Sequence, residues 1–264
     1  MQDIPRKKGK REDKKKRAPV HYGIYRLSIR EWLLYGAAGV GLCGLCAYIF
    51  YRSAAAFLIL LPFGMLFPLS RREALRKKRL RRLSLEFKDG IQILSSYLGA
   101  GYSLENAIAM SAEELRSLYG PKGMIATEFE ELAEKTRMNR PVEEGLLDLG
   151  ERSGLEDACN FAQVVAAAKR RGGGLVELIG QTAGIIRDKI QVQEEIHTMT
   201  AAKVLEQQVM SAVPFLIVLY IDLTSPGFFD SMYETEAGRL VMTCCLGTYG
   251  AAVILAGRIL DIEI

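Results

Sequence analysis

The sequence predicts an all-α, polytopic membrane protein in which two transmembrane helical hairpins flank a cytoplasmic bundle of about six helices. Three observations lead to this prediction. Four apolar runs lie in two pairs, one near each end of the chain; the middle repeats the helical spacing of apolar residues; and no strand-like alternation of any length occurs there. The modest glycine content, few cysteines and abundant aliphatic residues exclude collagen-like, disulfide-rich and wholly disordered classes.

Charge is segregated along the 264 residues, although the formal net charge is only +4. Residues 1–83 contain 20 Lys and Arg against 5 Asp and Glu, residues 84–200 contain 12 against 19, and residues 201–264 contain 3 against 7. The three segments therefore carry +15, −7 and −4. A basic first segment next to apolar runs is typical of the cytoplasmic flanks of a membrane protein.

Residues 1–30 are predicted to form a basic cytoplasmic arm, because 11 of them are Lys or Arg. The lysine-rich stretch 6–17 is compatible with nucleic-acid binding, but we favour attraction to anionic membrane lipid and expect no nucleic-acid partner. A cleaved signal peptide is the alternative for this region and the apolar run after it. About 30 residues of basic preamble is long for such a peptide, and a second apolar run follows at once.

Residues 31–70 predict the first transmembrane hairpin. Residues 33–51 and 53–70 are uncharged runs of 19 and 18 residues, separated by Arg52. As helices they would each be roughly 27 to 29 Å long, close to the ~30 Å hydrocarbon core of a bilayer. A single helix through both runs would be roughly 57 Å long, about twice that core. Two spans joined by a short turn at Arg52 are therefore expected.

Residues 71–205 are predicted to form the cytoplasmic domain, because apolar residues recur there at helical spacing between glycine- and proline-containing turns. Ser103 is placed to cap the second helix of the domain, and residues 155–171, apolar on most sides, are typical of the central helix of a bundle. The third helix is expected at about 124–137. The expected turns are at 99–101, 120–121, 139–141, 150–154 and 172–174.

Residues 206–264 predict the second transmembrane hairpin, with apolar runs at 207–221 and 240–257. The last cytoplasmic helix should begin at Leu175 and continue into the first of these runs, because no proline interrupts it before Pro214. A proline would break a soluble helix, but within a membrane neighbouring helices and hydroxyl side chains can satisfy the freed carbonyl. We therefore expect a helix kink at Pro214.

The positive-inside rule orients these spans. Residues 1–30 and 71–82 hold 11 and 8 Lys and Arg, whereas the loop at 223–239 holds Arg239 alone. Both basic segments should face the cytoplasm. The chain is therefore expected in the cell (inner) membrane as a multi-pass protein, with its N- and C-termini in the cytoplasm.

No pattern of catalytic or metal-binding residues stands out in the sequence. His21 and His197 are the only histidines, and no third residue is spaced to form a triad or a metal site with either. Cys43 and Cys46 lie in an apolar run and suit helix packing better than zinc binding. The glycines at 172–174 lack the Lys-Ser/Thr of a phosphate-binding loop. We therefore expect no enzyme activity, no cofactor and no metal.

The remaining functional signal is the negative charge of the middle segment. One interpretation is a solvated acidic face, and the other is a docking surface for a basic partner. The glutamates of the helix at 124–137 are expected to point largely outward. The candidate partner-binding residues are Glu113, Glu114, Glu128, Glu130, Glu131 and Glu134.

Three stretches of the sequence resemble the type II secretion system F domain family: LSLEFKDGIQILSSYLGAGYSLENAI at 83–108, RPVEEGL at 140–146 and RRGGGLVELI at 170–179. With two apolar runs before and two after, the chain is most similar to inner-membrane platform proteins of Tad/Flp pilus assembly. The similarity covers about residues 80–260 and favours the B-type subunit of the two platform paralogues. The lysine-rich arm has no counterpart in this resemblance.

The resemblance implies a non-enzymatic platform that couples a cytoplasmic secretion ATPase to the assembly of pilin. It implies a paralogous platform subunit as a further partner, within a homo- or hetero-oligomer. The family's positions carry over to this chain only as turn and packing residues, namely Gly101, Leu104, Gly172 and Gly173.

The alternative function is a membrane subunit of an ATPase-driven transporter. A transporter would be expected to line several spans with polar residues, whereas this sequence offers only Asp222 and scattered Ser and Thr. Asp222 stands at the end of its run, where an interfacial position is expected. The platform interpretation is therefore preferred.

Overall fold

The computed structural model describes residue 22, residues 29–171 and residues 174–260, apart from the side chains at 54–56, 63 and 66–71. Every regular element in these ranges is an α-helix, which confirms the predicted all-α fold for the described part of the chain. Most of the predicted arm, and both Gly172 and Gly173, lie outside the described residues.

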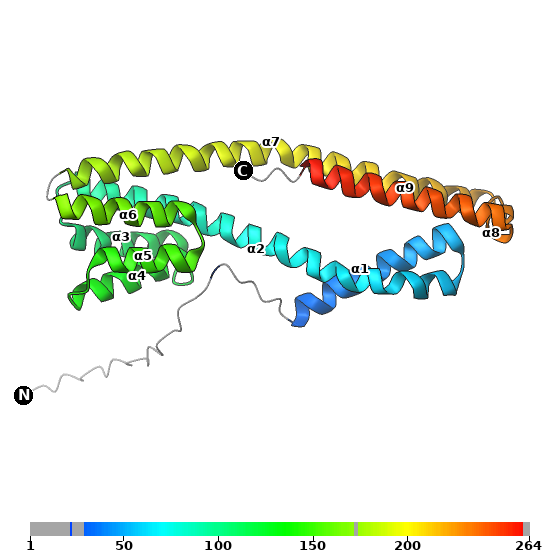
Figure 1. The fold of residues 1–264 in the computed structure, drawn as a ribbon, viewed down its shortest axis with the longest axis horizontal. Coiled ribbons are helices and arrows are strands. Elements are labelled where there is room, and N and C mark those ends of the chain that lie inside the picture. The colour runs from blue at the N-terminus through cyan, green and yellow to red at the C-terminus, as the bar shows by residue number, and fades with distance from the viewer. Residues whose placement is uncertain (1–21, 23–28, 172–173, 261–264) are drawn as a thin grey trace, which may run out of the picture.

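Two long helices run along most of the molecule and connect its two ends (Figure 1). Helices α3 to α6 gather at one end, and α1, α8 and α9 lie at the other (Figure 1). The helices of the described ranges are α1 (Ile29–Tyr51), α2 (Ala54–Gly99), α3 (Leu104–Tyr119), α4 (Met124–Arg137), α5 (Val142–Ser153), α6 (Glu156–Arg171), α7 (Leu175–Thr224), α8 (Asp230–Glu234) and α9 (Glu236–Leu260).

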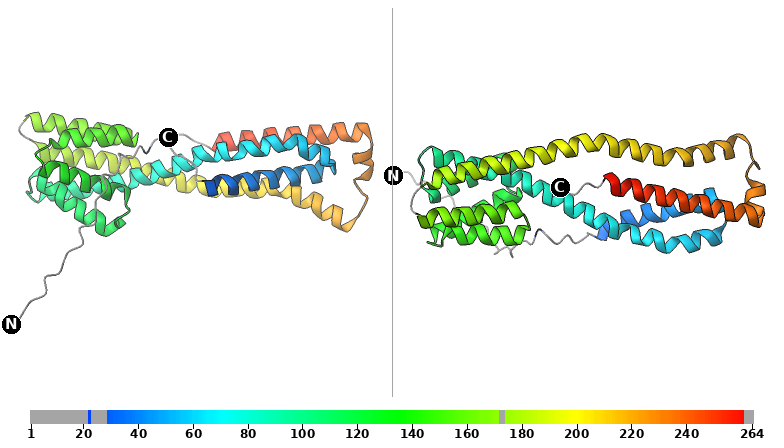
Figure 2. Two further views of the ribbon diagram at one scale, coloured as in Figure 1. Left: turned by 90° about the horizontal axis from the view of Figure 1, so that it is seen from below. Right: turned by 45° about the horizontal axis from the view of Figure 1, so that its top comes forward.

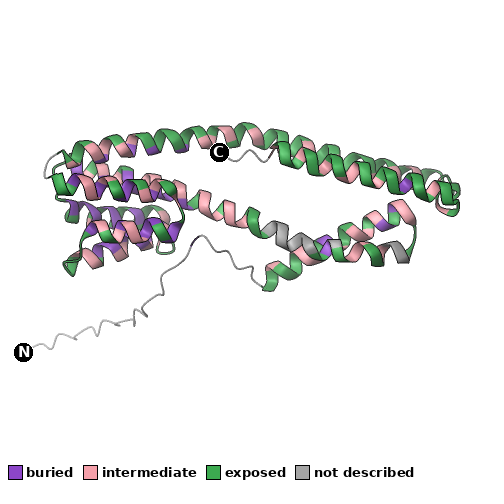
Figure 3. Ribbon diagram, in the orientation of Figure 1, coloured by how far each residue is buried: buried purple, intermediate pink, exposed green. Residues whose placement is uncertain are grey.

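The buried residues concentrate in a bundle made by the C-terminal half of α2, by α3 to α6 and by the N-terminal part of α7 (Figure 3). The side chains of Phe87 and Phe161 meet edge to face at its centre, with ring centroids 5.9 Å apart. Full burial of such a side chain stabilises the fold by about 1.5 to 3 kcal/mol. The largest fully buried side chains of the bundle are Leu83, Phe87, Ile91, Leu94, Leu98, Ile108, Leu115, Ile125, Phe129, Leu146, Phe161 and Ile179.

Helices α2 and α7 each continue without a break from the bundle into an apolar stretch. The expected boundaries at 70/71 and 205/206 therefore fall inside single helices of 46 and 50 residues. Between residues 69 and 89 the sequence has neither Gly nor Pro and is rich in Leu, Arg and Lys, all good helix formers, so nothing there ends α2. In α7 the helix also passes through Pro214 and ends only at Thr224.

Three helices of the described residues are long and apolar enough to cross a membrane, namely α1, α7 and α9. The predicted span at 53–70 belongs to α2, where part of the side chains lie outside the described residues. Figures 1 and 2 show the first part of α2 lying beside α1. Helix α9 contacts α7 through Tyr249, whose hydroxyl donates to the Ser211 carbonyl at 2.6 Å. Most residues of α7 and α9 are exposed, as Figure 3 shows.

A cluster of polar side chains joins these helices at the end far from the bundle. Arg52, which lies in the turn between α1 and α2 with a φ of 48°, forms ion pairs with Asp222 at 3.1 Å and with Asp230 at 3.0 Å. The Tyr48 hydroxyl donates a hydrogen bond to Asp222 Oδ2 at 3.2 Å. Asp222 therefore lies at the end of α7, as expected, and its partner is the residue that separates the first two apolar runs.

Candidate functional site

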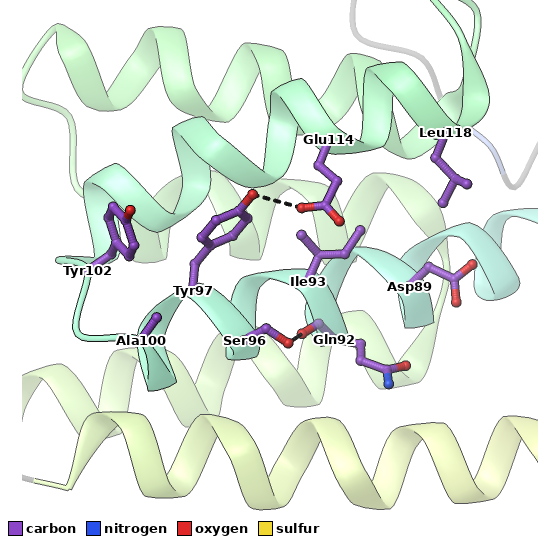
Figure 4. Close-up of a pocket in the computed structure, with 9 residues that line it drawn as sticks. All are labelled: Asp89, Gln92, Ile93, Ser96, Tyr97, Ala100, Tyr102, Glu114 and Leu118. Carbon is purple, nitrogen blue, oxygen red and sulfur yellow. Dashed lines mark hydrogen bonds between the residues drawn. The ribbon is translucent and has the colours of Figure 1, made fainter.

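A groove runs between α2 and α3 on the outside of the bundle and encloses about 530 Å³ (Figure 4). On α2, residues 89, 93 and 97 are four apart and lie on one face of the helix; on α3, Glu114 and Leu118 have the same spacing. These two rows form the walls of the groove. The lining residues are Asp89, Gln92, Ile93, Ser96, Tyr97, Ala100, Tyr102, Glu114 and Leu118.

The turn between the two helices closes one end of the groove. Gly101 has a φ of +90°, in a region that glycine adopts without strain, and Ser103 then caps α3 by accepting a hydrogen bond from the Asn106 N–H at 3.4 Å. This turn places the Tyr102 ring edge to face against Tyr97, with centroids 5.6 Å apart. Leu104 is buried at the start of α3. Gly101 and Leu104 thus occupy a turn and a packing position.

Two tyrosines hold the carboxylates of the groove in place. The Tyr97 hydroxyl donates to Glu114 Oε2 at 2.8 Å, and the Tyr119 hydroxyl donates to Asp89 Oδ2. The hydrogen bond to Glu114 raises the pKa of Tyr97. Burial, together with the hydrogen bond to Asp89, raises the pKa of Tyr119. Both phenols therefore stay protonated at neutral pH and act as donors.

The groove combines carboxylates with apolar and aromatic surface. Lys88 lies 3.4 Å from Asp89, whereas the described residues include no ion pair for Glu114. Tyr102 is 46 % exposed and Leu118 is 60 % exposed, so both are accessible to a partner. A long cationic side chain fits this combination, since its stem can cover the apolar surface while its head meets Glu114 and the tyrosine rings. The groove therefore places a carboxylate beside accessible apolar and aromatic surface.

The predicted glutamates divide between the groove and other parts of the bundle. Glu114 lines the groove, and its neighbour Glu113 is exposed beside it. Glu130 forms an ion pair with Arg116 at 2.9 Å, which ties α4 to α3. Glu134 is exposed on α4. Of these four glutamates, Glu114 alone is among the residues that line the groove.

Glu131 is half-buried, and burial, reinforced by the nearby charge of Glu128, raises its pKa. Because burial disfavours the charged form, the ionised Glu131 side chain lowers the stability of the folded state. This glutamate is therefore less accessible to a partner than Glu114.

The expectation that Glu128 points outward is wrong. Its side chain is only 6 % exposed and forms a bidentate ion pair with Arg152, at 3.0 and 2.7 Å. The reason lies in the spacing, because Glu128 follows Ile125 by three residues and precedes Leu132 by four. It therefore occupies the apolar face of α4, where a partner on α5 compensates its charge.

The remaining positions predicted from the sequence, Gly172, Gly173 and Pro214, are not among the residues that line the groove. Gly172 and Gly173 lie outside the described residues, and Gly174, which follows them, has a φ of +72° at the start of α7. Pro214 lies inside α7, far from the groove. Among the described residues no group of three or more His, Cys, Asp or Glu side chains could hold a metal ion.

Sequence reasoning did not single out Asp89, Tyr97 and Tyr102, which complete the groove around Glu114. A weak signal was present, because Asp89 and Tyr97 are eight residues apart on a helix whose opposite face carries the apolar residues of the core. The partner helix across the groove could not be identified from that spacing.

Comparison with known families gives a match over half of the chain. The family model described as type II secretion system (T2SS), protein F, matches residues 91–222, which is half of the chain. The matched segment begins in the last turns of α2, contains α3 to α6 and most of the groove, and ends near the end of α7. Comparison with curated proteins finds no match, and neither does comparison with solved structures.

Proposed function

Since the chain belongs to the type II secretion system protein F family, whose members are inner-membrane platform proteins of secretion and pilus-type machines, we propose that it couples a cytoplasmic secretion ATPase to pilin assembly. In this proposal the chain has two transmembrane hairpins, α1 with the start of α2 and the end of α7 with α9, and the bundle between them is cytoplasmic. Tad/Flp pilus assembly is the machine we assign it to, on the resemblance of its hairpins and bundle.

The observation that carries this proposal is the continuity of α7. The same 50-residue helix contributes Ile179, Ala183, Ile186 and Ile190 to the core of the bundle and ends in the apolar stretch that reaches Thr224. A displacement of the bundle is therefore passed directly to the apolar end of the molecule. Helix α2 supplies a second continuous connection of the same kind.

The basic stretch at 71–82 supports a cytoplasmic position for the bundle. It lies in α2 between the apolar first turns and the buried face that begins at Leu83, and it holds 8 Lys and Arg. Lys and Arg next to a span are retained on the cytoplasmic side and attract anionic lipid. Both chain termini then face the cytoplasm, where the segment from 71 to 205 is available to an ATPase.

We assign the ATPase contact to the groove between α2 and α3, with Glu113, Glu130, Glu131 and Glu134 as further acidic residues of the bundle. The groove suits a basic segment, and the bundle carries more acidic than basic residues. Exposed apolar side chains along α1, α7 and α9 are available to lipid, to pilin and to a second platform subunit, identical or paralogous. The charged residues of α1 and α9 lie near the helix ends, so the middle of these two helices offers a transporter no charged side chain.

The docking assignment is tested by charge reversal in the groove. We expect Glu114→Lys to weaken binding of the purified cognate ATPase by about tenfold, a loss of about 1.4 kcal/mol. The matched control is Glu151→Lys, which makes the same charge change at an exposed position of α5, outside the groove. If the Glu114→Lys variant and the unchanged protein bind the ATPase with equal affinity, the assignment of the contact to the groove is wrong.

The platform role and the topology have tests of their own. Deletion of the gene should abolish surface pilin, measured in material sheared from cells, and an intact copy should restore it. Normal surface pilin after deletion would overturn the platform role.

Reporter fusions near residues 120 and 232 should report cytoplasmic and external positions respectively, and a cytoplasmic signal at 232 would overturn the two-hairpin arrangement.

A further inference from the structure

Tyr22 precedes the first apolar helix by seven residues in sequence, yet its side chain lies in the bundle and is only 3 % exposed. Three groups of the bundle recognise it. Its backbone N–H donates to the Arg152 carbonyl at 3.1 Å, its hydroxyl donates to Glu128 Oε1 at 2.9 Å, and the Arg79 guanidinium lies 5.1 Å from the centre of its ring. Helix α5 thus contacts the main chain of Tyr22, α4 contacts its hydroxyl and α2 contacts the face of its ring.

Glu128 and Arg152, which contact Tyr22, are also held in place by ion pairs and hydrogen bonds within the bundle. Arg152 binds both oxygens of Glu128 and also lies 3.0 Å from Asp148, which in turn accepts a hydrogen bond from Lys135 at 3.3 Å. This network fixes the Glu128 carboxylate as an acceptor whether or not a phenol is present. Burial raises the pKa of Tyr22, and the Glu128 charge adds to the effect, so the phenol remains a donor.

We propose that Arg79, Glu128 and Arg152 form a binding site for a tyrosine side chain, which this chain fills with its own Tyr22. The site anchors the segment before α1 to the bundle. Phenylalanine could not use the carboxylate, and an aliphatic residue could use neither the carboxylate nor the guanidinium, so the site is selective for tyrosine.

The anchor adds a third connection between the bundle and the apolar end of the molecule. Only residues 23–28 separate Tyr22 from the start of α1 at Ile29, and a chain of this length spans at most ~25 Å. The bundle is thus attached through α2, through α7 and through the segment that follows Tyr22. In the sequence, the lysine-rich stretch 6–17 ends five residues before Tyr22.

This inference concerns contacts within one chain and holds whichever partner the bundle binds. It is tested on the full-length protein in detergent micelles with a photo-crosslinking phenylalanine analogue at position 22. We expect crosslinked peptides from α2, α4 or α5 of the same chain. The matched control places the analogue at position 25, where the sequence also has a tyrosine, and should not give these products. Isotopically mixed protein distinguishes products within a chain from products between chains.

Tryptic cleavage after Arg26, four residues from the anchor, gives an independent measurement. We expect Tyr22→Ala to be cleaved at least tenfold faster than the unchanged protein, with Tyr22→Phe in between and Tyr25→Phe unchanged. Arg79→Gln should also accelerate cleavage while it leaves the buried Glu128–Arg152 pair intact, whereas Lys78→Gln, the exposed neighbour, should not. These variants separate loss of the anchor from loss of folding, which thermal unfolding monitors in parallel.

Two results would overturn the proposal. Crosslinks from position 22 that form only between chains would show that Tyr22 of a second copy fills the site. Equal cleavage rates for Tyr22→Ala, Arg79→Gln and the unchanged protein, without crosslinks to the bundle, would show that the site does not hold the segment at all.

Discussion

Arg81 of α2 and Glu194 of α7 form a bidentate ion pair, in which the guanidinium Nε and Nη2 donate to the two carboxylate oxygens at 2.6 and 2.8 Å. These hydrogen bonds lower the pKa of Glu194. The pair lies where the core of the bundle ends, since Leu83 and Ile190 are the nearest buried residues on the two helices. It therefore joins the two long helices at the point where they leave the bundle.

Reversal of either charge of this pair should loosen the junction. We expect Arg81→Glu to lower the free energy of unfolding by about 1 kcal/mol, because the pair is bidentate but about a third exposed. The double variant Arg81→Glu with Glu194→Arg should recover most of the loss. Thermal unfolding and surface pilin, measured on the three variants, check this. A double variant as impaired as the single one would show that the ion pair itself does not matter.

The buried pair inside the bundle should be far more sensitive than the pairs on its surface. Glu128→Ala leaves the 8 % exposed Arg152 side chain without its main partner, and we expect a loss of about 3 to 5 kcal/mol in unfolding free energy. Glu130→Gln, which breaks the exposed pair with Arg116, should cost at most about 1 kcal/mol. Denaturant unfolding compares the two. Similar losses for both variants would contradict the buried position of Glu128.

Helices α5 and α6 approach each other closely at Gly150. A Cβ atom there would lie 2.9 Å from both the Cα and the Sγ of Cys159, and backbone cannot yield as a flexible side chain does. We expect Gly150→Ala to destabilise the protein by about 1 to 3 kcal/mol. Gly184→Ala is the control, because open space surrounds Gly184 in α7, and it should stabilise the helix by about 0.5 to 1 kcal/mol. The two melting temperatures should move in opposite directions.

Glu131 should make the stability of the bundle depend on pH. Its pKa is raised in the folded state by burial and by the charge of Glu128, so the folded state disfavours its ionised form. Glu131→Gln should therefore raise the melting temperature at pH 7. The gain should disappear as the pH falls through the raised pKa and below the ordinary value near 4.3, where both states bind the proton. Glu134→Gln, an exposed change on the same helix, should show little pH-dependent gain.

Local features of the fold could be predicted from the sequence because they depend on residues close together in the chain. The face shared by Phe87, Ile91 and Leu94 is buried as expected, Ser103 caps α3, and α4 runs from Met124 to Arg137 within the expected range. Helical spacing and capping chemistry were sufficient for each of these. The same is true of the continuation of α7 towards Pro214.

What could not be predicted depends on contacts between distant residues. The inward orientation of Glu128 requires Arg152 on another helix, and the burial of Tyr22 requires both of them. The groove could not be derived from Glu114 alone, since Tyr97 belongs to a different helix whose packing has to be known. The domain boundary expected at 70/71 followed from a change in composition, and the sequence did not reveal that one helix, α2, continues across it.

The unbroken length of α7 also has a geometric consequence. A 50-residue helix is about 75 Å long, so a tilt of the bundle by about 5° would displace the far end of a straight α7 by roughly 6 Å, a little more than one helical turn. Through Asp222, the ion pair with Arg52 would carry the turn between α1 and α2 along with that end. A rotation of a few degrees at one end of the molecule would thus become a displacement of about one helical turn at the other.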